Sequence, residues 1–229
     1  MSGQMIRTAV VVFSCALTSK EIPLLRGAML HLAQHDEVLF HDHVGEGFRY
    51  RYPLVQYRAV DGCAALVCVG EGVDAVDALL GTDFSAEVRI GRRRELLRVA
   101  YVHRQETEFR VDGTEHTYRL RRYLPLNQDN YMRYRQMDSL VERCSLIEHC
   151  LVGNILSFAK SMGVYLEQRV TARIVSIDSE RQYDYKHVGM LGFDLTFKSN
   201  ALLPSMIGLG KGVSLGYGEI INETNKMVR

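Results

Sequence analysis

Proline and cysteine are both scarce in this chain, and each scarcity excludes a class of protein. Four prolines in 229 residues, with 47% hydrophobic residues, exclude a disordered chain and indicate a folded globular protein. The five cysteines are odd in number and show no CxxC or Cys/His spacing, which argues against a disulfide framework or a zinc site. We expect them to be buried, reduced thiols.

The start of the chain lacks a hydrophobic run long enough to span a membrane. Arg7 followed by "TAVVVFSCAL" resembles the charged and apolar parts of a signal peptide. The run is shorter than the roughly 20 apolar residues that a spanning helix needs, and its three consecutive valines suit a buried strand. We therefore predict a core strand here, a cytoplasmic protein and no membrane partner.

Net charge is also nearly absent, at +1, but the charges are unevenly distributed. Residues 1–88 carry 6 basic and 11 acidic side chains, a net of −5, whereas residues 89–135 carry 12 arginines against 6 acidic side chains, a net of +6. Tyrosines interleave with the arginines in "YRLRRYLPLNQDNYMRYR". Arginine pairs with phosphates and stacks on bases, and tyrosine also stacks. The pattern indicates RNA contact, and an ordinary solvated strand face is the alternative. The candidate residues are Arg121, Arg122, Tyr131 and Arg133.

The expected order of elements in the first half favours a ferredoxin-like βαββαβ unit with an extra strand. The expected strands are 6–13, 50–60, 64–69, 85–90 and 95–103, and the expected helices are 22–34 and 72–80. Asp61-Gly62 is a strong signal for a two-residue turn between the second and third strands.

The second half repeats the pattern after an expected turn at "VDGTEH", around Gly113. Strands are expected at 116–124, 168–177 and 186–198, with a turn of helix at "NQDNYMRYR", a long helix at 139–162, and polar "DSERQYDY" as a loop. Ser139 and Glu142 form a capping-box pattern, and Gly163 stands at the end of the long helix. A glycine-rich loop stands where a second helix would complete the unit. We predict an α+β fold of two tandem ferredoxin-like domains, at residues 1–112 and 113–229.

That loop, "GLGKGVSLGYGEI" at 208–220, is dense in glycine. It does not match the Walker A spacing, and it does not follow a first strand and open a helix as a dinucleotide-binding loop would. It is either a hairpin without a ligand or a backbone cradle for a phosphate chain, with Lys211 as a point charge. Its candidate RNA-binding residues are Gly208, Gly210, Lys211, Gly212, Ser214 and Gly216.

A second constellation is the histidine pair in "LFHDH", His41 and His43. No downstream cluster of His, Asp or Cys at ligand spacing completes a metal site, so we expect no metal. Two imidazoles with pKa values near 6.5 are suited to proton transfer at neutral pH. Ordinary surface histidines are the alternative, and the nearby Arg49 and Arg51 favour the catalytic interpretation.

In these residues the chain resembles the CRISPR-associated endoribonucleases that process repeat RNA, the Cas-six family, and within it the Cas-six-b branch. The segments that carry the resemblance are "LLRGAMLHL", "LFHDH", "FRYRYPLVQYR", "LNQDNY", "GNILSFAKSMG" and the C-terminal "GLGKGVSLGYGEI". They occur in the expected order over nearly the whole chain. The family fold is two ferredoxin-like domains in tandem, with the glycine-rich loop as its signature.

The resemblance implies a reaction and its residues. Such enzymes cleave the repeat without a metal or cofactor: the ribose 2′-OH attacks its own 3′ phosphate, leaving a 2′,3′-cyclic phosphate and a 5′-OH. His41 and His43 match the catalytic histidine region, and the loop matches the RNA-contacting element. Some relatives use a tyrosine on the first helix and a lysine after the histidine. Here the first tyrosine is Tyr50, so we assign stabilisation of the phosphorane to Arg49 or Arg51.

Two other functions stay open. One is a non-cleaving repeat-RNA-binding subunit of a CRISPR complex, which the histidine pair disfavours. The other is a small-molecule phosphate enzyme, which the two-domain pattern and the Arg/Tyr stretch disfavour. The expected partners are CRISPR repeat RNA, other CRISPR effector subunits and, in a homodimer, a second copy of the chain.

Overall fold

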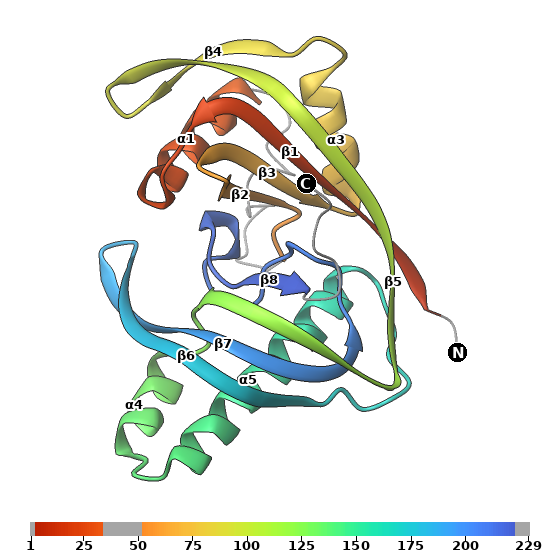
Figure 1. Cartoon of the computed structure of the whole chain (residues 1–229), viewed down its shortest axis with the longest axis vertical. Coiled ribbons are helices and arrows are strands. Elements are labelled where there is room, and N and C mark those ends of the chain that lie inside the picture. Colours follow the sequence, from red (N-terminus) through yellow and green to blue (C-terminus); the bar gives the residue numbers. More distant parts are fainter. Residues whose placement is uncertain (1–2, 34–51, 223–229) are drawn as a thin grey trace, which may run out of the picture. The chain divides into compact units, whose positions relative to one another are not determined.

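A computed structural model of the chain describes residues 3–33 and 52–222, and it divides into two compact units (Figure 1). The N-terminal unit comprises Ile6–Thr107 and Ser214–Gly216. The C-terminal unit comprises Met1–Met5, Glu108–Val213 and Tyr217–Arg229. The division falls within one long strand, a few residues before the predicted domain boundary at 112/113.

The described part of the N-terminal unit is an antiparallel sheet with the helices α1 and α3, in the predicted order of elements. Its elements are β1 (Gln4–Ala16), η1 (Ser19–Glu21), α1 (Ile22–Leu32), β2 (Val55–Val60), β3 (Cys63–Val69), α3 (Glu71–Leu80), β4 (Ser85–Ile90) and the first part of β5 (Arg93–Tyr123). The strand order is β2-β3-β1-β5, while β4 lies outside this order and, among the described strands, pairs with β5 alone. This is the sheet order of a ferredoxin-like unit with β4 as the extra strand.

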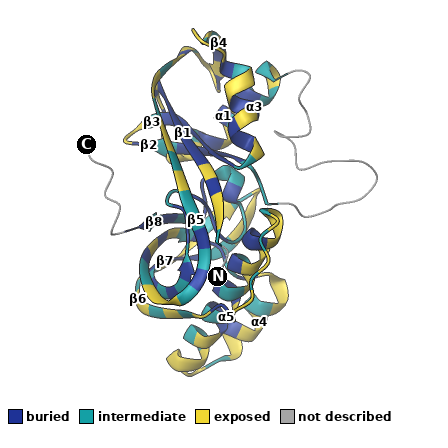
Figure 2. Cartoon of the chain, turned by 90° about the vertical axis from the view of Figure 1, so that its right-hand side faces the viewer, coloured by how far each residue is buried: buried dark blue, intermediate teal, exposed yellow. Residues whose placement is uncertain are grey.

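Local sequence explains these elements. Asp61 and Gly62 both have positive φ, at 49° and 78°, which is the conformation that a tight hairpin turn between β2 and β3 requires. Pro23 lies in the first turn of α1, where its missing N–H costs nothing. Side chains of the strands and of the helices α1 and α3 pack together to form the core, as the dark blue of Figure 2 indicates. Its largest members include Phe13, Leu25, Met29, Tyr57 and Leu66.

The C-terminal unit repeats the arrangement with one replacement. Its elements are the second part of β5, α4 (Gln128–Gln136), α5 (Leu140–Ser161), β6 (Ala172–Tyr185), β7 (Val188–Leu202) and β8 (Glu219–Asn222). The short helix η2 (Val213–Leu215) contains the point at which the chain passes from one unit to the other. The strand order is β6-β7-β5-β8, and α5 packs across the sheet (Figure 1). The segment between β7 and β8 takes the place of a second helix. The α+β class and the tandem ferredoxin-like architecture are therefore confirmed.

The prediction of a turn around Gly113 between two strands is wrong, because β5 is a single strand from Arg93 to Tyr123. The feature that produced the prediction is an irregularity within the strand. The register of β5 with β7 shifts between Val111 and His116, and the Asp112 carboxylate accepts a hydrogen bond from the N–H of Thr114 at 2.7 Å. An Asp-Gly pair thus makes a bulge in the strand rather than a break between two strands.

The polar segment "DSERQYDY" is also not a loop. It forms the second half of β6, and the hairpin turns instead at Lys186 and His187, whose φ angles are 53° and 64°. β6 is an edge strand of its sheet, and half of its side chains face solvent. Polar side chains on such a face resemble loop composition in the sequence.

The predicted caps of α5 are half correct. Ser139 is the N-cap residue, but its side chain makes no capping hydrogen bond. Gly163 ends the helix as predicted: its φ is +69°, and the N–H of Val164 reaches back to the carbonyl of Ala159. All five cysteines are free thiols, and three are buried. Among the residues that the structure describes, no helix is long and apolar enough to cross a membrane.

Candidate nucleic-acid interface

The glycine-rich loop is fixed to the end of β5 by backbone hydrogen bonds. The N–H of Lys211 donates to the carbonyl of Leu124 at 3.1 Å, and the N–H of Gly218 donates to the carbonyl of Arg122 at 3.1 Å. Across the loop, the N–H of Leu209 donates to the carbonyl of Gly218 at 2.8 Å. The two ends of the loop are therefore held together and against one strand.

Two of the glycines are required by the packing of this loop. Gly210 has φ +85°, and a Cβ there would lie 2.7 Å from the ring of Tyr123. Gly212 has φ +76°, and a Cβ there would lie 2.8 Å from Tyr185 and 2.9 Å from Tyr217. A left-handed backbone and the absence of room for a methyl group each favour glycine. The two glycines therefore let residues 210–212 lie directly on tyrosine rings of the C-terminal unit.

The same packing leaves donors available. Within the described part of the chain, no hydrogen bond uses the backbone N–H of Gly210 or of Gly212. These two groups flank Lys211, which is half-buried and makes no ion pair with any described residue. Backbone N–H groups beside a cation are a suitable arrangement for an anion.

Arg122 is held by protein contacts. It is a non-glycine residue with φ of 51°, and its N–H donates to Asp194 at 2.7 Å. Its guanidinium lies over the ring of Tyr217, at 4.3 Å, and near that of Tyr183, at 5.7 Å. One face of this guanidinium is therefore occupied by tyrosine, and the assignment of Arg122 as an RNA-binding residue stays a prediction.

The tyrosines form a cluster that the sequence analysis did not single out. Tyr183 and Tyr185 each meet Tyr217 edge to face, with 5.8 Å between ring centroids. The Tyr217 hydroxyl donates to the carbonyl of Asp184 at 2.8 Å, and Lys186 lies over Tyr185 at 5.6 Å. The alternation in "RQYDY" contained the signal, because it places two tyrosines on one face of a strand.

Asp194 anchors the cluster from β7. It accepts hydrogen bonds from Arg181 at 2.5 Å, Ser179 at 3.0 Å and the N–H of Arg122. Burial disfavours the ionised carboxylate, but the hydrogen bonds and the Arg181 charge outweigh burial and hold the pKa of Asp194 below its usual value. The carboxylate therefore stays charged and fixes the backbone on which the loop rests.

The remaining predicted residues are distributed over several elements. Arg121 is exposed on β5, opposite Glu219 of β8. Tyr131 and Arg133 lie on α4, a separate element whose Tyr134 hydroxyl donates to Glu180 of β6 at 2.9 Å. The structure thus brings the loop together with Arg122 and places the α4 residues elsewhere in the unit.

The other predicted residues of the loop lie at its start and in its middle. Gly208 bridges to Glu219, Gly216 has φ +82°, and Ser214 lies in the short helix η2. The four predicted catalytic residues lie outside the described residues. They are His41, His43, Arg49 and Arg51.

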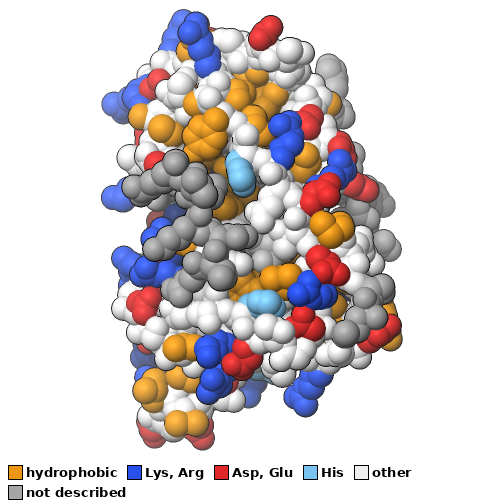
Figure 3. All heavy atoms as spheres, turned by 45° about the vertical axis from the view of Figure 1, so that its right-hand side comes forward, with side chains coloured by type: hydrophobic (Ala, Val, Ile, Leu, Met, Phe, Trp, Pro, Cys, Tyr) orange, Lys and Arg blue, Asp and Glu red, His pale blue; other side chains and the backbone are white. Residues whose placement is uncertain are grey.

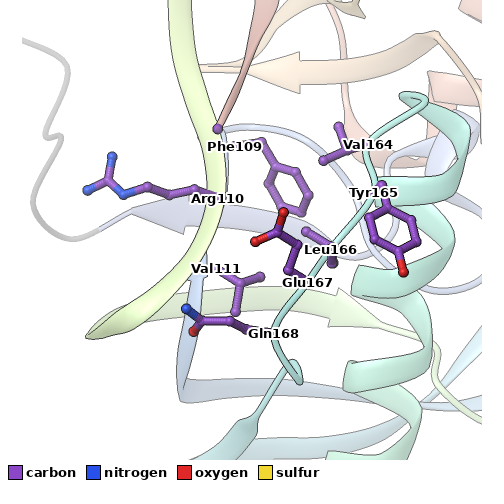
Figure 4. A pocket seen from close by; sticks show the side chains of 9 residues that line it. Phe109, Arg110, Val111, Val164, Tyr165, Leu166, Glu167 and Gln168 are labelled. Atoms are coloured by element: carbon purple, nitrogen blue, oxygen red, sulfur yellow. The ribbon is translucent and has the colours of Figure 1, made fainter. Parts of the chain in front are cut away.

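The C-terminal unit also contains a pocket beside the end of α5, shown in Figure 4. It is lined by Phe109, Val111, Val164 and Leu166, with Glu167 at its wall, while Arg110 points away from it. The described residues contain no group of three or more His, Cys, Asp or Glu that could hold a metal ion. Figure 3 shows basic side chains in several separate groups on one face rather than lining one cleft. The loop and its tyrosine cluster are the best candidate for a site.

Comparison with known proteins gives a match for each half of the chain. The Cas6b N-terminal domain model matches residues 4–108, and the Cas6b C-terminal domain model matches residues 110–223. An uncharacterized protein of Methanocaldococcus jannaschii, MJ0978, is 32% identical over 99 residues, which are 43% of this chain and 66% of that protein.

Solved structures share the fold. A crystal structure of Cas6b superposes with a TM-score of 0.84 at 23% identity, over 96% of this chain and 100% of the other. A second one, of the CRISPR RNA processing endoribonuclease Cas6b, gives a TM-score of 0.73 at 21% identity with the same coverage. At these sequence identities, the superpositions show that the chain has the same fold, and they show nothing beyond the fold.

Proposed function

The chain belongs to the Cas6b family, and from this membership we propose that it is an endoribonuclease that cleaves CRISPR precursor transcripts within the repeat. The observation that carries the proposal is the match of both Cas6b domain models, in order, over residues 4–108 and 110–223. A protein of this fold is named a CRISPR RNA processing endoribonuclease. The product would be the guide RNA.

The proposed reaction needs no metal. The 2′-OH of the nucleotide 5′ of the cleavage point attacks the adjacent phosphorus, and the bond to the 5′ oxygen of the next nucleotide breaks. The products are a 2′,3′-cyclic phosphate and a 5′-OH. One group must take the proton of the 2′-OH, and another must give a proton to the leaving oxygen.

His41 and His43 are proposed for these two roles, because one imidazole can be neutral while the other is protonated near pH 6.5. Arg49 or Arg51 is proposed to stabilise the extra negative charge of the phosphorane, since a guanidinium matches phosphate oxygens bidentately. The support for these assignments is the "LFHDH" and "FRYRYPLVQYR" resemblance.

The glycine-rich loop is proposed to hold RNA rather than to cut it. The unused N–H groups of Gly210 and Gly212, with the Lys211 ammonium between them in sequence, are suited to phosphate oxygens. Ser214 and Arg121 are proposed to add further contacts. The tyrosine cluster beneath the loop keeps these donors in place, because the loop cannot shift without losing its ring contacts.

The test is a cleavage assay with labelled cognate repeat RNA, with and without EDTA. We expect the same cut in both samples. A single 2′-deoxy substitution at the nucleotide 5′ of the cleavage point should block cutting and leave binding intact, because affinity comes from other phosphates and bases. Cleavage of the deoxy substrate would point to an attacking water and overturn the proposed mechanism.

The alternative function is a catalytically silent subunit that binds repeat RNA within a CRISPR complex. It shares the loop but makes no use of the histidine pair. Binding of repeat RNA without cleavage by the wild-type protein would favour it. Effector subunits and a second copy of the chain are proposed partners in either case.

A further inference from the structure

The hairpin formed by β4 and the start of β5 has two different faces. Arg89 lies directly opposite Arg94, and Ser85 lies directly opposite Arg98. Directly opposite residues of an antiparallel pair project from the same face, and alternate residues project from the other face. Val88, Ile90 and Leu97 on the inner face are buried. The exposed residues Ser85, Glu87, Arg89, Arg94, Leu96 and Arg98 form what we call the outer face.

The outer face carries three arginines and one acid. The single acid, Glu87, lies 3.4 Å from Arg94, which is long for an ion pair, and the side chains of Glu87 and Arg94 are 66% and 85% exposed. Such an exposed pair is worth little. Arg98 makes no ion pair with any residue in the described ranges. The Nε–H of Arg89 donates a hydrogen bond to the carbonyl of Gly91 at 3.0 Å, which leaves the terminal N–H groups of this guanidinium available to an anion.

The inner face of the same basic stretch is neutralised. Arg93 lies between Glu21, at 2.7 Å, and Glu95, at 2.8 Å. Its charge is therefore satisfied within the unit. By contrast, Arg89 and Arg94 are like charges placed directly opposite each other, an arrangement that destabilises a hairpin unless an anion lies across both.

The chemistry of the face favours a nucleic acid as this anion. Residues 85–98 contain five arginines and no lysine. The planar guanidinium fork matches phosphate oxygens bidentately and also stacks on bases, whereas lysine acts as a point charge. Among the strands that the structure describes, β4 pairs with β5 alone, and it is additional to the four strands that complete the ferredoxin-like sheet. The hairpin therefore provides a surface that the fold itself does not require.

We propose that the outer face of the β4–β5 hairpin is a second RNA-contacting surface, which holds the sugar–phosphate backbone of the transcript without reading its sequence. The inference rests on the proposed function for the identity of the polyanion. It adds an RNA contact in the N-terminal unit that is separate in sequence from both the histidine pair and the glycine-rich loop.

The test is the double variant Arg89→Gln/Arg94→Gln, with a repeat RNA that carries the blocking 2′-deoxy substitution as the probe. Each lost phosphate contact on single-stranded RNA lowers the slope of log K against log salt by about 0.7. Two lost contacts should reduce that slope by about 1.4. Over a tenfold decrease in salt, as from about 1 M to about 0.1 M, the affinity of the variant should therefore fall behind that of the wild type by roughly 25-fold. A scrambled RNA of equal length should lose affinity by the same factor.

Two charge changes of the opposite sign provide matched controls. Glu87→Gln removes the one acid of the outer face and should strengthen RNA binding. Glu71→Gln makes the same charge change on the exposed start of α3 and should leave affinity unchanged. An equal gain in both controls would indicate a net-charge effect and overturn a local surface.

The variant Arg94→Gln/Arg98→Gln repeats the test if the first one unfolds, because neither of its side chains bonds to the backbone in the structure. Unchanged affinity and salt slope in folded variants would overturn the proposal and favour an acidic protein partner for this face. Cleavage by the wild type is measured in parallel. A wild type that binds but does not cleave refutes the proposed function alone, whereas a cleaving wild type with insensitive variants refutes this inference alone.

Discussion

The guanidinium of Arg122 lies over the ring of Tyr217, with 4.3 Å between Cζ and the ring centroid. Arg122 is near the end of β5, and Tyr217 closes the glycine-rich loop. The carbonyl of Arg122 also accepts the N–H of Gly218. One residue in a left-handed conformation therefore holds the end of the loop by its backbone and by its side chain.

Replacement of this arginine should destabilise the C-terminal unit. Arg122→Ala removes the cation–π contact and should lower the free energy of unfolding by about 1–2 kcal/mol. Arg122→Gly loses the same contact but relieves the positive φ, so it should cost less. Urea unfolding of the two variants and the wild type measures the difference. An alanine variant as stable as the wild type would show that the stacking contributes nothing.

Gly210→Ala should destabilise the protein because its φ is +85° and its Cβ would meet the ring of Tyr123 at 2.7 Å. The left-handed backbone alone costs about 1–2 kcal/mol for a non-glycine residue. Gly153→Ala is the matched control, since Gly153 lies within α5 with nothing within 4 Å of the added Cβ. It should stabilise the helix by up to about 1 kcal/mol.

Melting temperatures of the two glycine variants check the stability effect, and repeat-RNA affinity checks the function of the loop. If Gly210→Ala melts like the wild type, the packing argument is wrong. If a folded Gly210 variant binds RNA as tightly as the wild type, the loop is not a phosphate cradle at that position.

Asp194 should make stability depend on pH in the acid range. Its folded pKa is lowered, mainly by the N–H of Arg122 and by Arg181 acting against burial. The unfolded chain therefore binds the proton first as pH falls, and stability is lost from about pH 4, the unfolded value, down through the folded pKa.

Asp194→Asn keeps an acceptor for Arg122 but removes the charge. It should cost about 1.5–3 kcal/mol at pH 7, and it should remove this part of the acid dependence. The free energies of unfolding of the variant and the wild type are compared by urea unfolding between about pH 3 and 6, a range that brackets the unfolded carboxyl pKa of about 3.9. Parallel curves for variant and wild type over that range would contradict the assignment.

The histidine pair should control the rate of cleavage. His41→Ala or His43→Ala should each slow single-turnover cleavage by at least about a hundredfold, because a general acid or base contributes roughly 10²–10⁴-fold. RNA affinity should stay nearly constant, and the double variant should lose less than the product of the single losses. The wild-type rate should rise and fall with pH, with both limbs within about a unit of 6.5.

Near wild-type rates in both alanine variants would make the pair ordinary surface histidines. The non-cleaving RNA-binding function would then become the preferred one. Binding measured on the same samples separates this outcome from loss of folding.

The sequence by itself determined most of the helices and strands and their order along the chain. Hydrophobic alternation, the Asp61-Gly62 turn, Pro23 and Gly163 act within a few residues, so they can be recognised without the fold. They led to both ferredoxin-like units, and the quoted motifs led to the family. The sequence did not predict the bulge after Val111 or the second half of β6. Strand pairing decides whether polar or turn-forming residues bend a strand or end it.

Tertiary structure alone decided what the glycines of the loop contact. In the sequence, Gly210 and Gly212 indicate close approach of some group, and a phosphate and a tyrosine ring are equally compatible with that requirement. Tyr123 and Tyr185 are distant along the chain from the glycines that they contact, and Asp194 is distant along the chain from Arg122. Only the pairing of β5, β6 and β7 brings these residues together. Such contacts arise from the register of the sheet, which residues separated along the chain set jointly, and no local pattern specifies them.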